Sequence, residues 1–417
     1  MTLIKQKWII ISLVFLFLSF PLQALSNSTT DYNTQKEALN EFAFDLYKQV
    51  AQSNQNIIIS PYSLSSLLVI LLNGAQGNTQ QQLAKLLHFN YENGKNNFNL
   101  DAIDQELLGS NACPRDAYCK PNDNNTVFLI ANALWADRSF SYIPAFLTTL
   151  QQAKVTQFHQ ADFKNLPEKA RTTINNWVEK KTNGYIQQLI PQGAISKDTK
   201  LVLVNAIYFN GLWMLPFQRK NTLLKPFLLK NGVSVQTPMM NQENRFLYSE
   251  DEHLQLLQLG YTNSNIKLAI LLPKGNYTTQ DVLKTLNQEI FSKLVSASIE
   301  QKVQVSIPRF NLDSTFDTLS STLQKMGLKE AFTDQANFSK MTKSALSISA
   351  IIQKAIIKVD EKGTVATAAT STLLIATAAY PQPIIKFNAN HPFLLVLFDA
   401  KSGIILFIGQ VMNPTGV

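Results

Sequence analysis

The sequence has little cysteine and histidine and lacks the short motifs of common enzymes. Its 417 residues include two cysteines and four histidines. The histidines are dispersed and none lies near the cysteines, so the spacing of known metal sites is missing and we expect no metal or other cofactor. The motifs G-x-S-x-G, G-x-x-x-x-G-K-[ST], H-E-x-x-H and G-x-G-x-x-G do not occur. Because few bases could activate a nucleophile, we predict a protein that is not an enzyme.

Clustered positive charge is missing as well. The formal net charge is +8, but Lys5 and Lys7 lie in a segment that we expect to be removed, which leaves 8 − 2 = +6. The other basic residues are scattered and do not fill one helical face. Nucleic acid is therefore not an expected partner.

Residues 1–26 have the pattern of a secretory signal peptide. Basic residues precede an apolar segment from Trp8 to Phe20, Pro21 ends it, and Ala24-Leu25-Ser26 supplies small residues for cleavage. The apolar segment is short for a full membrane span. We expect a secreted, extracellular protein, or a periplasmic one if the source is a Gram-negative bacterium, with no membrane partner after removal of the signal.

The two cysteines, Cys113 and Cys119, lie in one polar stretch rich in proline and asparagine. In an exported protein, two cysteines so close in sequence predict a local disulfide. Closing such a short loop would stabilise the fold by about 2 kcal/mol.

Helical patterns dominate the first half of the chain and strand patterns the second. Apolar residues at helical spacing predict a helix over 34–52 and another over 314–326. Long apolar runs predict buried central strands over 126–136 and 201–209. No repeat, linker or composition break divides the chain, so we predict one α+β domain over residues 27–417.

Between Gly363 and Ile385 no side chain carries a charge. The first part of this run is small and β-branched, which suits a strand. No turn separates it from the strand-like residues before it, so it cannot form an ordinary hairpin with them. The run has the composition of a strand that lacks a neighbouring partner.

Five blocks of sequence occur in a recognisable order. They are N-I-I-I-S-P-Y-S-L within 56–79, L-V-L-V-N-A-I-Y-F-N-G-L-W within 201–217, V-S-I-P-R-F within 305–332, V-D-E-K-G-T within 351–364, and F-N-A-N-H-P-F within 387–414. Together they resemble the serpin family, large inhibitors that trap proteases by inserting a cleaved loop into their own β-sheet. The resemblance covers essentially residues 34–417.

The resemblance implies a single serpin-type domain of the α+β class. It would have a large central, mostly antiparallel sheet, two smaller sheets, about nine helices, and an exposed reactive loop over about 361–386. It also implies a monomeric suicide inhibitor that forms a covalent 1:1 complex with a target serine protease, with papain-like cysteine proteases as a further target class. The alternative is a non-inhibitory serpin that acts as a carrier or chaperone.

The loop hinge implied by the family pattern consists of Glu361, Gly363, Thr364, Ala366 and Ala368. Alternate residues of an inserted strand share one face, so Thr364, Ala366 and Ala368 would all face the core. All three are uncharged and small, whereas a charge there would be buried without a partner. This composition favours an inhibitor over a non-inhibitory relative.

The bond that a protease would attack follows from family spacing. Counting forward from Gly363 gives Thr377-Ala378, which we favour, and counting back from Phe387 gives Ala379-Tyr380. The small residues around both predict an elastase-like or subtilisin-like target.

Two further sites follow from the resemblance. The polar "shutter" beneath the opening strands corresponds to Ser60, Ser63, Asn205 and Gln353, where Gln353 replaces the usual histidine. The "breach", where the loop first enters the sheet, corresponds to Trp213 and Glu361. Residues 101–108 lie near the helix that binds heparin in some serpins, but they are acidic, so heparin is not an expected partner.

Overall fold

A computed structural model describes residues 22–51, 54–89, 103, 104, 107, 127–153, 155–363 and 384–416 of the 417-residue chain. The described helices are α1 (Leu22–Val50), α2 (Pro61–Gly74), α3 (Gly77–Leu86), α5 (Pro144–Gln152), α6 (Pro167–Lys181), α7 (Thr279–Thr285), α8 (Gln288–Ser296) and α9 (Leu319–Lys325). The strands are β1 (Ile57–Ile59), β2 (Val127–Asp137), β3 (Thr156–Ala161), β4 (Leu201–Asn210), β5 (Leu223–Leu228), β6 (Ser234–Glu250), β7 (Leu254–Gly260), β8 (Ile266–Pro273), β9 (Ile299–Pro308), β10 (Phe310–Phe316), β11 (Ala350–Val359), β12 (Ile385–Asn388), β13 (Phe393–Asp399) and β14 (Ile405–Val411). The predicted α+β class is confirmed.

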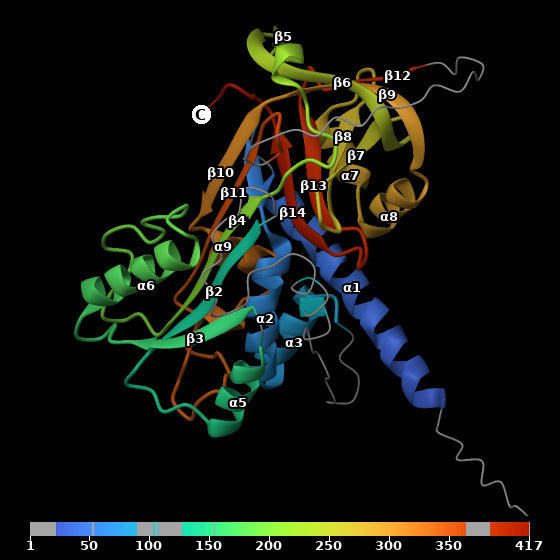
Figure 1. The fold of residues 1–417 in the computed structure, drawn as a ribbon. Helices are drawn as coiled ribbons and strands as arrows, with labels where there is room; N and C mark the ends of the chain where they lie inside the picture. The colour runs from blue at the N-terminus through green and yellow to red at the C-terminus, as the bar shows by residue number, and fades with distance from the viewer. Residues whose placement is uncertain are drawn as a thin grey trace, which may run out of the picture.

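One sheet has five strands in the order β10-β11-β4-β2-β3. Its neighbours alternate in direction: β10 with β11 and β4 with β2 are antiparallel, whereas β11 with β4 and β2 with β3 are parallel. Every residue of β4 is buried, as the apolar run over 201–209 predicts for a central strand. Figure 1 shows this sheet between α6 on the left and α2 on the right.

The other sheet has nine strands and is antiparallel except for the pairing of β12 with β9. The described residues therefore form two hydrogen-bonded sheets, where the sequence predicts three. The reason is the 17-residue strand β6, which pairs with β5 and β9 and, through Leu247–Glu250, also with β7. This long strand joins two sheets into one.

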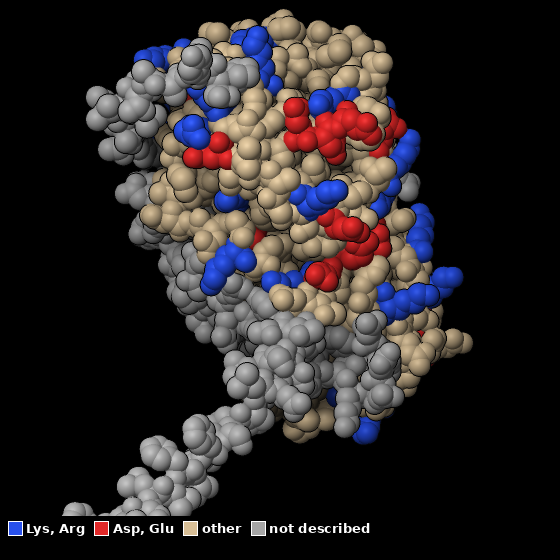
Figure 2. Space-filling model, turned by 90° about the vertical axis from the view of Figure 1, so that its right-hand side faces the viewer, with Lys and Arg blue, Asp and Glu red and all other residues tan. Residues whose placement is uncertain are grey.

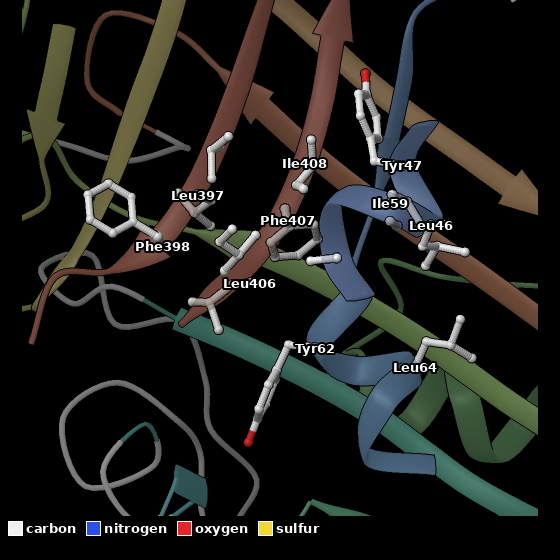
Figure 3. Packing of buried hydrophobic residues seen from close by; sticks show 14 of the residues in the cluster. Leu46, Tyr47, Ile59, Tyr62, Leu64, Leu397, Phe398, Leu406, Phe407 and Ile408 are labelled. Carbon is white, nitrogen blue, oxygen red and sulfur yellow. The ribbon is translucent and has the colours of Figure 1, made fainter. Parts of the chain in front are cut away.

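The core lies where α1 and α2 pack against β13 and β14. The side chains that fill it include Leu46 and Tyr47 from α1, Leu64 from α2, and Phe407 and Ile408 from β14, all of them buried (Figure 3). Pro61 occupies the first turn of α2, where its missing N–H costs nothing, and it fixes the start of this helix. The first turn of α2 thereby comes to lie under the five-stranded sheet.

Two predicted elements are wrong at their boundaries. The helix predicted over 34–52 begins at Leu22, because neither proline nor glycine interrupts residues 22–33. The helix predicted over 314–326 is shorter, since Ser314 to Phe316 continue β10 and pair with β11, and α9 begins only at Leu319. Alternation of inward and outward side chains outweighs helical spacing there.

Several predictions fall outside the described residues. Positions 1–21, Cys113 and Cys119, and most of 101–108 lie there, so the signal peptide, the disulfide and the heparin expectation remain predictions. Within the described part of the chain, no helix has the length and hydropathy needed to cross a membrane.

Candidate functional site at the seam between two strands

The parallel pair β4 and β11 forms a seam in the middle of the five-stranded sheet. Ala350 to Ile357 of β11 pair with Val202 to Phe209 of β4. Gln353 and Asn205, two predicted shutter residues, are direct partners in this register. Both are fully buried, so their polar groups need partners within the protein.

Gln353 connects β11 to the start of α2. Its Oε1 accepts a hydrogen bond from the Ser60 backbone N–H at 3.0 Å, and its Nε2 donates to the Ser60 carbonyl oxygen at 2.9 Å. The Ser60 hydroxyl donates to the carbonyl of Leu406 in β14 at 2.7 Å. The Gln353 amide thus both donates to and accepts from the Ser60 backbone. A neutral histidine ring has one donor and one acceptor nitrogen, so it could make the same two bonds in only one of its tautomers.

Asn205 belongs to a separate group with Ser63 and Asn132. The Ser63 hydroxyl donates to Asn132 Oδ1 at 3.0 Å, and Asn132 Nδ2 donates to the Ser63 carbonyl at 2.7 Å. Asn205 Nδ2 donates to both Ser63 Oγ and Asn132 Oδ1. Sequence reasoning missed Asn132, although an asparagine within the apolar run over 126–136 was a detectable signal.

The four predicted shutter residues are therefore brought together under the seam. Their arrangement is what a shutter requires, because buried hydrogen bonds tie the two strands to the helix beneath them. Their role in opening the sheet stays a prediction.

Glu361, at the end of the seam, is a buried carboxylate that is paired with the partly exposed Arg309. Its side chain is only 2% exposed, and both carboxylate oxygens lie 2.8 Å from Nε of Arg309. The Thr222 hydroxyl donates to Oε1 at 2.6 Å. Burial disfavours the charged form, but the hydrogen bonds from Arg309 and Thr222 outweigh it and lower the pKa of Glu361. Sequence reasoning named Glu361 but missed Arg309 and Thr222, which lie far from it in the chain.

Trp213 holds the same end of the seam through the backbone. Its indole Nε1 donates to the Asp360 carbonyl at 2.9 Å, and its backbone N–H donates to the Lys362 carbonyl at 2.9 Å. The indole stacks on Tyr261 with ring centroids 4.5 Å apart. Trp213 thus holds the backbone on both sides of Glu361, the other predicted breach residue.

Gly363 ends the turn that follows β11, and this position requires glycine. Its φ is +131°, and a Cβ there would lie 2.1 Å from the carbonyl oxygen of Gly211. The turn from Asp360 to Gly363 is closed by two backbone hydrogen bonds between those residues. Gly363 is the last residue described before the charge-free run. Thr364, Ala366 and Ala368 of the hinge, and both predicted scissile bonds, Thr377-Ala378 and Ala379-Tyr380, lie outside the described residues.

A five-stranded mixed sheet over a polar shutter, with a glycine turn at the head of its central seam, defines a particular class of protein. Comparison with known proteins identifies it. The family model for "Serpin (serine protease inhibitor)" matches residues 37–414, and this chain belongs to the serpin family.

Relatives agree over nearly the whole length. An uncharacterised serpin-like protein of Methanosarcina acetivorans is 35% identical over 380 residues, which cover 90% of this chain and 85% of the relative. Human leukocyte elastase inhibitor is 34% identical over 389 residues, 90% of this chain and 98% of the relative. The solved structure of human thyroxine-binding globulin complexed with thyroxine superimposes with a TM-score of 0.76 at 27% identity, covering 92% of this chain and all of that one.

These similarities support a protease inhibitor rather than an enzyme, since members of the family generally form complexes with target proteases. They leave the target and the mechanism of this chain open, because the family also contains non-inhibitory members such as thyroxine-binding globulin.

Proposed function

We propose that this protein is a secreted suicide inhibitor of serine proteases that prefer small residues, of elastase-like or subtilisin-like specificity. The protease serine would attack the loop at Thr377-Ala378 and form an acyl-enzyme, and the hinge side of the cleaved loop would then enter the seam. Papain-like cysteine proteases are a further target class for the same reaction. The active form would be a monomer that forms a covalent 1:1 complex.

The direction of the strands at the seam is the observation that carries this proposal. A chain that turned back at Gly363 along the seam would run antiparallel to β11. Because β4 is parallel to β11, the same chain would also run antiparallel to β4. Insertion would replace one parallel pairing with two antiparallel ones, which are slightly more stable per residue.

The length and composition of the loop fit the seam. The parallel register spans the eight residues from Ala350 to Ile357, and the segment from Thr364 to Leu374 has enough residues to run along it. A new ladder of about ten backbone hydrogen bonds would contribute on the order of 10 kcal/mol at about 1 kcal/mol each. The absence of charge and proline in that segment means that neither a buried unpaired charge nor a missing backbone donor would oppose its burial.

The experiment is incubation with pancreatic elastase and with subtilisin, followed by a denaturing gel and mass spectrometry. The proposal predicts a complex that survives denaturation, and a released C-terminal peptide that begins at Ala378. Release at Tyr380 would support the alternative bond. Cleavage without any covalent complex, with either enzyme, would contradict the proposal.

One substitution can distinguish insertion of the cleaved loop from simple binding of the protease. Thr364→Arg would place a charge on the face that enters the core, so this variant should become a substrate that is cleaved without trapping the protease. The matched control is Thr367→Arg, at a position that would face outward after insertion and should keep much of the inhibition. Equal inhibition by wild type and Thr364→Arg would refute insertion.

A carrier function is the second candidate, and a hollow between α1 and α8 favours it. This hollow has a volume of about 320 Å³, and its lining is mostly polar, with Lys36, Glu37 and Gln288 beside the apolar Phe291 and Phe398. A carrier would be cleaved in the loop without forming a complex and would gain no thermal stability from cleavage. Melting temperatures before and after cleavage therefore distinguish the two candidates.

A further inference from the structure

Exposed apolar side chains gather at one end of the molecule. Of ten large apolar side chains that are exposed in the described residues, five lie between Met214 and Val233. They are Met214, Leu223, Leu224, Leu228 and Val233. We call the exposed side chains of residues 214–233 the 214–233 surface. Exposed apolar side chains are normal singly, but a cluster indicates an interaction site.

The hairpin of β5 and β6 keeps these side chains in solvent. Phe227 is completely buried and anchors β5 to the body of the protein. Leu224, Pro226 and Leu228 lie at alternate positions and so share the opposite face of the strand. That face is open, since Leu224 is 72% exposed and Leu228 is 48% exposed. In Figure 1 β5 lies at the upper end of the molecule.

The same surface is basic and carries no compensating acid. Residues 211–242 contain Arg219, Lys220, Lys225 and Lys230 and neither aspartate nor glutamate. Arg219, Lys220 and Lys230 are exposed. Within the described part of the chain, the recorded ion pairs involve none of these four cations. Glu361, which approaches Thr222, is buried and paired with Arg309.

Acidic side chains gather elsewhere. In Figure 2 the visible Asp and Glu side chains form a group at the upper right, another at the centre right and a small one at the upper left, with Lys and Arg side chains between them. The acidic residues of the β6–β7 turn, Glu250, Asp251 and Glu252, belong to a different part of the nine-stranded sheet from β5. Elsewhere acidic and basic side chains are interspersed, whereas residues 211–242 carry basic residues alone, so the 214–233 surface is apolar and cationic.

Two observations argue against a protein strand or a second copy as the occupant. Pro226 lies in the middle of β5, where it removes a backbone donor from this edge strand and disfavours strand addition. Two copies joined through this surface would bring their unpaired cations together. An outward-facing set of aliphatic side chains flanked by Lys and Arg instead matches the interface of an anionic bilayer.

We propose that the 214–233 surface binds anionic phospholipid membranes peripherally. Leu224 and Leu228 enter the boundary between headgroups and acyl chains, while Arg219 and Lys220 lie against the lipid phosphates. This contact is independent of protease inhibition, and it replaces the sequence-based expectation of no membrane partner. It would hold the protein at a membrane through the sheet that also contains β12, the strand that follows the charge-free run.

The test is cosedimentation of the full-length protein with phosphatidylcholine vesicles that contain either no phosphatidylglycerol or about a third. We expect at least tenfold stronger binding to the anionic vesicles at low salt, and weaker binding as salt increases. Leu224→Gln with Leu228→Gln should weaken binding at least tenfold. Arg219→Gln and Lys220→Gln should each weaken it about fivefold, the factor that corresponds to roughly 1 kcal/mol per basic residue at a lipid surface.

Matched controls keep the test specific. Ile299→Gln removes an apolar side chain that is also exposed but lies on β9, and it should leave binding unchanged. All variants share one N-terminus, so the apolar segment from Trp8 to Phe20 contributes equally to each. Equal binding by wild type and the double leucine variant would overturn the proposal. So would a dimer, detected without vesicles, that disappears in the double leucine variant, because a second copy would then be the occupant.

Discussion

The substitution Glu361→Gln tests how much the ion pair between Glu361 and Arg309 stabilises the fold. The substitution keeps the shape of the side chain but removes its charge, and it replaces one of the two oxygens that accept from Arg309 by an NH₂ group, which can only donate. Removing one partner of a fully buried pair costs about 3–5 kcal/mol. Here the Arg309 side chain is 41% exposed and water can solvate it after the change. We therefore expect a loss of about 2 kcal/mol, close to the value of hydrogen bonds to charged groups.

The expected loss can be measured as a melting temperature. For a chain of this size, about 2 kcal/mol corresponds to a decrease of roughly 2–3 °C at pH 7. The pH dependence has a definite sign. Because the folded protein lowers the pKa of Glu361, the carboxylate stabilises the fold above its usual pKa of about 4.5. That stabilisation begins to be lost below the usual pKa of about 4.5 and is lost fully as the pH falls through the lower, folded pKa, so the difference between wild type and Glu361→Gln should shrink over this range.

A surface pair provides the control. Arg245 and Glu300 lie 3.3 Å apart with both side chains well exposed, so Glu300→Gln should change the melting temperature by less than about 1 °C. The reasoning would be refuted if Glu361→Gln behaved like Glu300→Gln at pH 7. It would also be refuted if its deficit stayed constant as the pH fell from 7 through the lower, folded pKa of Glu361.

Two further predictions concern the seam. Gly363→Ala should lower the melting temperature at least twice as much as Gly232→Ala: both glycines have positive φ, but a new Cβ at Gly363 meets backbone atoms whereas one at Gly232 meets nothing within 4 Å. Equal effects would show that steric contact at Gly363 is unimportant. Gln353→Ala and Asn205→Ala should each cost about 2–4 kcal/mol in urea unfolding, because each leaves buried polar groups without partners. Because the two residues are direct partners in the register, packing can couple them, but their separate hydrogen-bond groups predict a coupling of less than about 1 kcal/mol in the double variant. A coupling of about 2–3 kcal/mol would contradict the separate groups.

The sequence predicts the parts of this molecule that depend on local pattern. Strands β2 and β4 lie within a residue of their predicted limits, because long apolar runs have few other ways to be buried. The helix predicted over 314–326 was wrong for residues 314–316, because they belong to a strand whose partner, β11, is more than thirty residues away in the sequence. The candidate site was predicted from the family resemblance and not from local sequence patterns. Ser60 and Gln353 are 293 residues apart, so no local pattern indicates that they are in contact.

The residues that sequence reasoning missed share a property. Asn132, Arg309 and Thr222 each complete a site by contact with a residue on another strand or turn. Asn132 and Thr222 lie outside the five blocks of sequence, and Arg309 lies within one of them, but the block alone does not indicate its partner. Their partners are determined by sheet register: Asn132 lies opposite Asn205 because β2 and β4 pair in one alignment. A shift of that alignment by one residue would place the two side chains on opposite faces of the sheet, where they could not contact each other. Such residues become visible only when the register is known.

If the cleaved loop inserts as proposed, the hydrogen bonds of the sheet favour this seam as its point of entry. Among the described residues, Gln353 bonds to Ser60, while Asn205 bonds to Ser63 and Asn132, and no described side-chain hydrogen bond joins Gln353 to Asn205. Separating the two strands would therefore break no side-chain hydrogen bond between them, but both strands are bonded to residues of one helix start, Ser60 and Ser63, so one of the two groups would have to move. The main cost of opening is the parallel backbone ladder, which is weaker per residue than the antiparallel ladder between β4 and β2. The other parallel pair, β2 with β3, lies at the edge of the sheet, away from β11 and from the turn at Gly363. The seam thus combines the weaker kind of pairing with a direct connection to the one charge-free segment able to replace it.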